Sequence, residues 1–584
     1  MAGNSAPAET GGGSISMMDR PKRWDKPFDP NMSDGDVFSL LLRPEFSGID
    51  ASRFPAGAPF EGILKNDCRI LRFAPGDLIV REGDYGNSAF LVLSGDARVV
   101  FQGGLPAHVL GRQSTRRRNW LRSILAVLRW SPINEMRDTQ RYQATQSNVQ
   151  DTPETPSLFR VRNPDEIFKE PPSPNPSDPA PPLQDHLKSG IFHEGALFGV
   201  IAALGRVRRT ATIYAETSCE VLEMRWQALR DIKARDESWN EIIESSYRGT
   251  QLQIQINDHP LFRDLDPRVR KQVVDATLNE SYGSFEWHVG FKDRPRGVAS
   301  EKDEPLVNRQ GDYPDGLLLV GGGFGRVAVE LSHGRRTIEY LREGDIYGLD
   351  ELYETWKTGQ VQPLRTTLTA LGYMHVLRVP YEVLVEHVFP NIEPPTQRLA
   401  DAAQRPFAED AFLEWAVQER FINGTQTMLI DTERCVRCDD CVRACSRTHN
   451  GNPRFLRHGK SLGHWMVANA CMHCVDPVCM IGCPTGAIHR SLNGGSVIIN
   501  DDSCIGCGTC AQSCPYDNIR LVGIQDTDGR PVLDPQSQKP ILKATKCDLC
   551  EGHPGGPSCA RACPHDALQR VDLRDLLRAN EAGL

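Results

Sequence analysis

The chain has 584 residues, a formal net charge of −9 at pH 7, and a composition that is 39% hydrophobic and 24% charged. This length exceeds what a single hydrophobic core organises, so we expect several domains. The negative charge argues against nucleic acid as a partner, and no run approaches the roughly 20 apolar residues of a transmembrane segment.

Residues 1–34 form the first predicted segment, a flexible tail. The sequence MAGNSAPAETGGGSISMMDRPKRW has neither the charged and apolar regions of an export signal nor a twin arginine. This absence favours a cytoplasmic location.

Residues 35–255 follow with β-type alternation that is broken by Gly-Asp turns. Within them, Ile79 to Val100 predicts three strands joined by glycine-containing turns. The pattern returns at 307–329, which shares a Gly-Asp-Tyr turn. A second pair of similar segments is 195–199 and 344–348, each ahead of an Arg-Thr segment. We therefore expect a tandem repeat, with domains at 35–255 and 256–395.

These paired signatures resemble the cyclic nucleotide-binding domain family, a β-roll closed by helices. The resemblance implies a phosphate site made by a short helix and an Arg, and Arg209 stands at that Arg position as a candidate anion contact. The Glu that binds the ribose in this family is replaced by Val200 and by Leu349. We therefore expect β-rolls that serve regulation or docking and do not bind a cyclic nucleotide.

A long insertion at about 105–190 interrupts the first predicted β-roll. Its proline-rich part, 152–182, is expected to be extended or disordered. Ahead of it, residues 116–130 predict a basic amphipathic helix. Such a helix could pack on its own β-roll, bind a partner protein, or make a peripheral contact with a membrane surface.

A glycine-rich stretch, Gly321 to Gly325, lies in the second β-roll. It does not have the Gly-x-Gly-x-x-Gly spacing and does not precede a helix, so a dinucleotide site is not indicated. We expect a tight β-turn between two strands.

Sixteen of the eighteen cysteines lie between Cys435 and Cys563. The other two, Cys68 and Cys219, are predicted to be buried strand residues. A secreted disulfide framework would come with a signal peptide, so the cluster of cysteines points to metal ligands.

The cysteines form four motifs that follow a helical connector at 396–424 and a short strand at 427–431. The basic pattern is C-x2-C-x2-C-x3-C, and a proline follows the last cysteine of the second, third and fourth motifs. The candidate ligands are Cys435, Cys438, Cys441 and Cys445; Cys471, Cys474, Cys479 and Cys483; Cys504, Cys507, Cys510 and Cys514; and Cys547, Cys550, Cys559 and Cys563.

Three cysteines on one short loop can reach three irons of a cubane, and the fourth ligand then comes from another motif. Sixteen cysteines in four such motifs predict four [4Fe-4S] clusters. The alternative is zinc, but zinc ribbons use two separated C-x2-C pairs. His449, His458 and His473 lie among the motifs and are expected to be surface residues or outer neighbours of the clusters.

Residues 425–584 resemble the four-cluster iron-sulfur subunits of molybdopterin oxidoreductases and hydrogenase-linked ferredoxin-like proteins, through the segments 471–474, 483–488 and 546–550. The resemblance implies a double bacterial-ferredoxin-like domain with nested pairing. It joins Cys435, Cys438 and Cys441 with Cys563; Cys547, Cys550 and Cys559 with Cys445; Cys471, Cys474 and Cys479 with Cys514; and Cys504, Cys507 and Cys510 with Cys483.

The fold class we expect is therefore multidomain α+β, with two cyclic nucleotide-binding-like β-rolls followed by the four-cluster domain. The leading hypothesis is a non-catalytic electron-transfer subunit of an oxidoreductase complex. Its partners would be a catalytic subunit, such as a molybdopterin enzyme, a hydrogenase or another dehydrogenase, and a redox donor or acceptor. The rival hypothesis is a sensor in which the cluster state is reported to the β-rolls.

Overall fold

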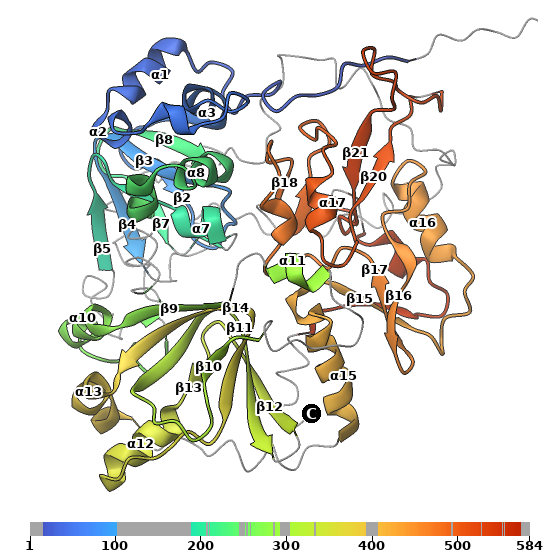
Figure 1. Cartoon of the computed structure of the whole chain (residues 1–584). Helices are drawn as coiled ribbons and strands as arrows, with labels where there is room; N and C mark the ends of the chain where they lie inside the picture. Colours follow the sequence, from blue (N-terminus) through green and yellow to red (C-terminus); the bar gives the residue numbers. More distant parts are fainter. Residues whose placement is uncertain are drawn as a thin grey trace, which may run out of the picture.

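The structure is a computed structural model, and it describes three packed units (Figure 1). No helix among the described residues is both long and apolar enough to cross a bilayer. The described residues are 16–101, 188–205, 208–209, 211–243, 252, 255–256, 259–283, 287–292, 304–331, 334–392, 407–491, 495–526, 528–551, 553 and 555–573.

The first unit is a β-roll of two antiparallel four-stranded sheets, ordered β1-β8-β3-β6 and β2-β7-β4-β5. Val92 and Val221 from one sheet and Ile213 from the other share a buried core. The strands are β1 Cys68–Phe73, β2 Leu78–Val80, β3 Ser88–Ser94, β4 Ala97–Phe101, β5 Lys188–Phe192, β6 Leu197–Phe198, β7 Thr212–Ala215 and β8 Cys219–Arg225; the helices are α1 Asp34–Leu41, α2 Pro44–Ser47, α3 Phe60–Asp67, α7 Val200–Gly205 and α8 Trp226–Lys233.

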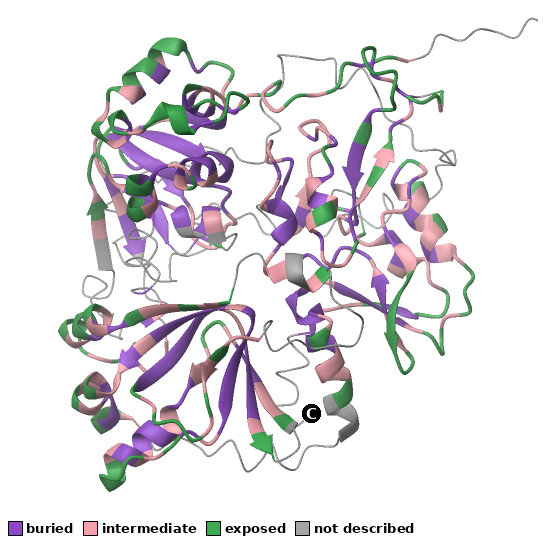
Figure 2. Cartoon of the chain, viewed as in Figure 1, coloured by how far each residue is buried: buried purple, intermediate pink, exposed green. Residues whose placement is uncertain are grey.

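The second unit is a β-roll built on two long strands, β11 and β14, within a six-stranded sheet. Figure 2 shows that β3 and β8 of the first roll and β11 and β14 of the second are largely buried, whereas peripheral helices such as α1 are largely exposed. The elements are α10 Pro267–Ala276, β9 Leu278–Gly283, α11 Trp287–Lys292, β10 Leu306–Asn308, β11 Gly316–Leu331, β12 Gly334–Arg342, β13 Ile346–Tyr347, α12 Leu349–Thr358, β14 Thr367–Pro380 and α13 Tyr381–Val383.

The two β-rolls repeat the same segment, in which two glycines precede a helix, as the sequence predicted. Gly195 and Gly199 have φ of +82° and +78°, and Gly344 and Gly348 have φ of +90° and +89°. These left-handed conformations favour glycine because it has no Cβ. In each roll a helix begins directly after the second glycine, α7 in one and α12 in the other.

The prediction of a tight turn at Gly321–Gly325 is wrong, because this stretch lies inside the continuous strand β11. The pairing of β11 with β14 shifts register between Val320 and Gly322 and again between Gly323 and Gly325. Gly323 has φ of +81°. The glycines therefore accommodate β-bulges that bend one long strand.

The third unit carries the sixteen cysteines on short strands, helices and loops. Strand β15 lies where the sequence predicts a strand and pairs with β17 and β22. The elements are α15 Phe407–Gln418, β15 Thr427–Asp431, α16 Asp440–Thr448, β16 Leu456–Leu462, β17 Trp465–Asn469, β18 Ile488–Arg490, β19 Val497–Ile499, α17 Thr509–Ser513, β20 Arg520–Gly523, β21 Leu542–Thr545, α18 Ser558–Arg561 and β22 Leu568–Val571.

Residues 16–33 of the expected flexible tail pack against two units. Met18 donates its backbone N–H to the carbonyl of Leu533 at 3.0 Å and is 7% exposed. Arg23 forms ion pairs with Asp67 and Asp231 of the first β-roll, at 2.8 and 3.0 Å. This segment therefore connects the third unit to the first β-roll through both apolar and charged contacts.

Both β-rolls contact the third unit directly. Arg230 of α8 donates to the carbonyl of Ile481 at 2.5 Å. In the second roll, Arg326 pairs with Glu414 of α15 at 2.6 Å, and Lys292 of α11 pairs with Asp517 at 2.8 Å. Both β-rolls therefore hold the cysteine-bearing unit, which lies beside them in Figure 1.

Candidate metal centre

The sixteen cysteines of the third unit are all free thiols. The thiols that act on Cys441, Cys445, Cys474 and Cys510 are cysteines that the resemblance assigns to the same cluster as each of these four. We follow the implied pairing in four sets. We name them set A (Cys435, Cys438, Cys441, Cys563), set B (Cys445, Cys547, Cys550, Cys559), set C (Cys471, Cys474, Cys479, Cys514) and set D (Cys483, Cys504, Cys507, Cys510).

Sets A and B meet on helix α16. Burial raises the pKa of Cys441 to about 11, with smaller contributions from the thiols of Cys563 and Cys435. Burial also raises the pKa of Cys445, one helical turn further on, and here the neighbouring thiols are those of set B. Cys441 and Cys445 are consecutive cysteines of the first motif and lie one helical turn apart, yet they belong to two different sets.

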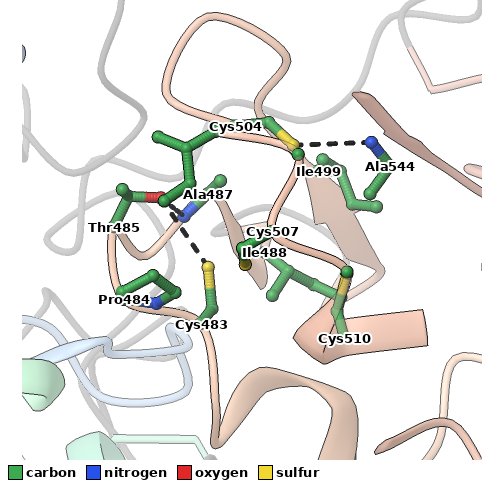
Figure 3. A pocket seen from close by; sticks show the side chains of 13 residues that line it. Cys483, Pro484, Thr485, Ala487, Ile488, Ile499, Cys504, Cys507, Cys510 and Ala544 are labelled. Carbon is green, nitrogen blue, oxygen red and sulfur yellow. Dashed lines mark hydrogen bonds between the residues drawn. The ribbon is translucent and has the colours of Figure 1, made fainter. Parts of the chain in front are cut away.

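Sets C and D have the same relation around α17. The pKa of Cys474 is raised well above its ordinary value by burial and by the other three thiols of set C. Burial and the other three thiols of set D raise the pKa of Cys510 to about 12. Figure 3 shows the four cysteines of set D around a small pocket whose wall includes Ile488 and Ile499.

Main-chain N–H groups point at several of these sulfurs. Arg454 donates to Cys445 Sγ at 3.2 Å, Ala567 to Cys563 Sγ at 3.3 Å, and Ala544 to Cys504 Sγ at 3.5 Å. Thiolates that ligate iron accept such hydrogen bonds, and these bonds adjust the reduction potential of the cluster. The donor pattern fits cysteines that act as thiolate ligands.

Buried and half-buried cations surround the sets. Arg570 Nη2 lies 3.1 Å from Cys547 Sγ of set B, and Arg570 Nη1 donates to the carbonyl of Cys471 of set C at 3.1 Å. Lys543, which is 0% exposed, donates to the carbonyl of Cys504, and Lys546, which is 3% exposed, donates to the carbonyl of Cys547. Buried charges require compensation, and a cubane with four thiolate ligands is anionic. The residues present therefore fit iron-sulfur clusters.

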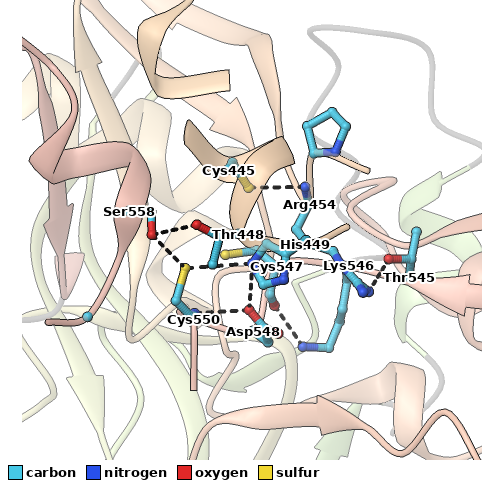
Figure 4. A network of polar contacts seen from close by, with 12 residues as sticks. Cys445, Thr448, His449, Arg454, Thr545, Lys546, Cys547, Asp548, Cys550 and Ser558 are labelled. Atoms are coloured by element: carbon cyan, nitrogen blue, oxygen red, sulfur yellow. Dashed lines mark hydrogen bonds and ion pairs between the residues drawn. The ribbon is translucent and has the colours of Figure 1, made fainter. Parts of the chain in front are cut away.

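His449 is a buried neighbour of set B (Figure 4). Its Nε2 lies 3.6 Å from Cys550 Sγ and 3.4 Å from Asp548 Oδ1. Burial lowers the pKa of His449 to about 4, so the ring is neutral at pH 7. His458, by contrast, is exposed, and His473 is buried beside set C.

The candidate anion contact, Arg209, is turned into the first β-roll. Its guanidinium donates to the carbonyls of Gly199 at 2.9 Å and Ser88 at 2.8 Å, and it lies 5.4 Å from the ring of Phe90. Arg209 is 8% exposed. The guanidinium thus binds carbonyl groups of its own β-roll.

Cys68 and Cys219 lie in β1 and β8 and are 0% and 2% exposed, so the prediction that they are buried strand residues is confirmed. The basic segment 116–130 and the proline-rich segment 152–182 lie outside the described residues.

The sequence reasoning missed the roles of Arg490 and Arg570. Arg490 donates to the carbonyls of Cys474 and Val475, both at 2.7 Å, and so supports a loop of set C from β18. The sequence contains a pattern that could have indicated these roles. Each arginine lies six residues after the proline that follows a cysteine motif, Pro484 for Arg490 and Pro564 for Arg570.

Comparison with known proteins agrees with this chemistry. Residues 463–573, which contain three of the four cysteine motifs, match the family model of a 4Fe-4S dicluster domain. The putative electron transport protein YsaA of Escherichia coli is 30% identical over 161 residues, which are 26% of this chain and 92% of YsaA. The chain belongs to this family of iron-sulfur electron-transfer proteins.

Another relative of this electron-transfer protein is the arsenate respiratory reductase iron-sulfur subunit ArrB of Shewanella sp. It is 35% identical over 98 residues, which are 15% of this chain and 42% of ArrB. The chain thus spans less than two thirds of that relative. Among solved structures, the regulatory domain of Toxoplasma gondii PKA with cAMP covers 62% of this chain and 94% of its own, at 13% identity and a TM-score of 0.19.

Proposed function

We propose that this iron-sulfur electron-transfer protein carries four [4Fe-4S] clusters, one on each of sets A to D, and relays electrons between a catalytic oxidoreductase subunit and a second redox partner. When bound, the clusters would supply one-electron redox chemistry. The cysteines of each set would hold them, and the surrounding hydrogen bonds and cations would set their potentials.

The order of the sets supports a relay. Sets A and B share α16, through Cys441 and Cys445. Sets C and D share the α17 segment, through Cys510 inside the helix and Cys514 at its C-cap. Arg570 contacts one cysteine of set B and one of set C. These links support the linear order A, B, C, D.

The exposure of the cysteines carries the proposal. Of the sixteen, only Cys438 of set A and Cys507 of set D are exposed, whereas the others are buried or half-buried. The two exposed ligands therefore belong to the first and last sets of the order. Electrons could enter at one end and leave at the other, while the middle of the row is shielded from solvent.

The partner we propose is a molybdopterin enzyme, a hydrogenase or another dehydrogenase, and the location we propose is the cytoplasm, where free thiols are maintained. The β-rolls would act in docking or regulation. Because Arg209 is engaged by Gly199 and Ser88, we infer that the first roll does not take up a cyclic nucleotide.

The test begins with anaerobic purification of the full chain and measurement of its iron and acid-labile sulfide. Four clusters require about sixteen of each. A Cys504→Ala variant should lose about four iron atoms, whereas the control Cys219→Ala should lose none, because Cys219 lies in β8. Colourless wild-type protein after reconstitution would contradict the proposal.

A second candidate function is redox sensing. One observation favours it: Leu229 and Ile232 of the first β-roll share a buried core with Met480 and Ile488 of the third unit. Co-purification separates the two functions. A stoichiometric oxidoreductase partner supports the relay, and a fully loaded protein without such a partner supports the sensor.

A further inference from the structure

His473 lies between two cysteines of set C, Cys471 and Cys474, and is 1% exposed. The backbone N–H of Val497 donates to its Nδ1 at 3.0 Å. A ring nitrogen that accepts a hydrogen bond carries no proton, so the proton of the neutral ring is on Nε2. Strand β19 therefore fixes the tautomer of His473 by a main-chain contact.

The Nε2 atom is buried and has no hydrogen-bond partner among the described residues. A buried donor without an acceptor is destabilising, and such groups in native structures are rare. Three cations, Lys546, Arg570 and Arg490, act electrostatically on the ring. These cations make the surroundings favourable for an electron-rich acceptor.

We propose that His473 Nε2–H donates a hydrogen bond to a sulfur of the cluster on set C. This inference rests on the proposed function, because the acceptor is part of that cluster. A donor to sulfur stabilises the extra negative charge of the reduced cluster and raises its potential. His473 is thus a positioning residue that favours the reduced state at one of the inner clusters of the relay.

Two substitutions separate the roles of the two ring nitrogens. Asn places its amide near Nδ1, so His473→Asn keeps the acceptor for Val497 N–H and removes the donor at Nε2. Gln reaches as far as Nε2, so His473→Gln keeps a donor there. Asn also suits the backbone, because His473 has φ of +50° and Asn tolerates this left-handed region.

The experiment is a redox titration of the full, iron-loaded chain, followed by electron paramagnetic resonance. In His473→Asn, we expect one midpoint potential to shift to a more negative value while the others stay. The same cluster should also lose a strongly coupled exchangeable proton, detected by pulsed resonance after transfer to deuterium oxide. In His473→Gln, the proton should remain and most of the shift should disappear.

Unchanged potentials and an unchanged proton signal in iron-loaded His473→Asn would overturn the inference. Equal loss of iron in both variants would also overturn it, because the residue would then be needed for folding regardless of a donor at Nε2. Wild-type protein that fails to bind about sixteen iron atoms would instead refute the proposed function. The two failures are therefore distinguishable.

Discussion

The contact between the first β-roll and the β18–β19 hairpin depends on a glycine that leaves no room for a side chain. Gly495 has φ of +69°, and a Cβ there would lie 2.0 Å from Cε2 of Tyr85. The guanidinium groups of Arg208 and Arg490 lie over the Tyr85 ring, 4.9 and 4.8 Å from its centroid. The ring therefore cannot move aside without losing these two contacts.

We expect Gly495→Ala to lower the free energy of unfolding by about 2–5 kcal/mol. The left-handed backbone alone costs an alanine about 1–2 kcal/mol. Insertion of a methyl group against a held ring adds about 1–3 kcal/mol, which is the usual cost of overpacking. The second contribution depends on Tyr85 and the first does not.

The assay is anaerobic denaturant unfolding of the full chain, with Gly463→Ala as the matched control. Gly463 has φ of +57°, and a Cβ there would meet nothing within 4 Å, so the control should cost only about 1–2 kcal/mol. In a Tyr85→Ala background, Gly495→Ala should cost no more than this control, so the double-mutant cycle isolates the contact. A cost equal to that of Gly463→Ala in the wild-type background would refute the reasoning.

Three further predictions concern pairing, pH and ligands. Iron analysis should show that Cys514→Ala removes about four iron atoms. In this variant, a second substitution in the same set, Cys471→Ala, should remove no further iron. A second substitution in set D, Cys504→Ala, should remove about four more iron atoms. Burial works to raise the pKa of Glu414, but Arg326 and Tyr340 outweigh it and lower this pKa. The stability that ionised Glu414 contributes is therefore present at neutral pH and is lost as the pH falls through its lowered pKa. Glu414→Gln should lower the free energy of unfolding by about 1–3 kcal/mol at pH 7. In acid unfolding, this variant should lose less stability with falling pH than the wild type. Titration of the full chain with cyclic AMP or cyclic GMP should give no saturable micromolar binding, because Arg209 is engaged; saturation in calorimetry would contradict this.

The cysteine motifs were readable because their chemistry is local. Three thiols within seven residues, as in Cys435 to Cys441, already specify a loop that can wrap a cubane. The tandem repeat was readable for a similar reason, since Gly199 and Gly348 each precede a helix in a left-handed conformation. In both cases a few neighbouring residues determine the backbone.

Features that depend on tertiary contacts were not readable. Glycine is common in turns, so the sequence predicts a turn around Gly323. In the structure, β11 continues through this position because it pairs with β14, and the change of register is taken up by a bulge. The segment around Met18 has the composition of a tail, and it is ordered by contacts with residues more than 500 positions away, such as Leu533. Local propensity carries no information about such partners.

The same limit applies to Arg490, and its contacts show how the first β-roll is joined to the third unit. Arg490 holds the carbonyl of Cys474 on one side and stacks on Tyr85 on the other. Tyr85 forms an isolated β-bridge with Arg208, which precedes Arg209 in the sequence. In the proposed relay, the first β-roll would act as a fixed wall beside set C and would leave the exposed Cys438 and Cys507 free to meet partners.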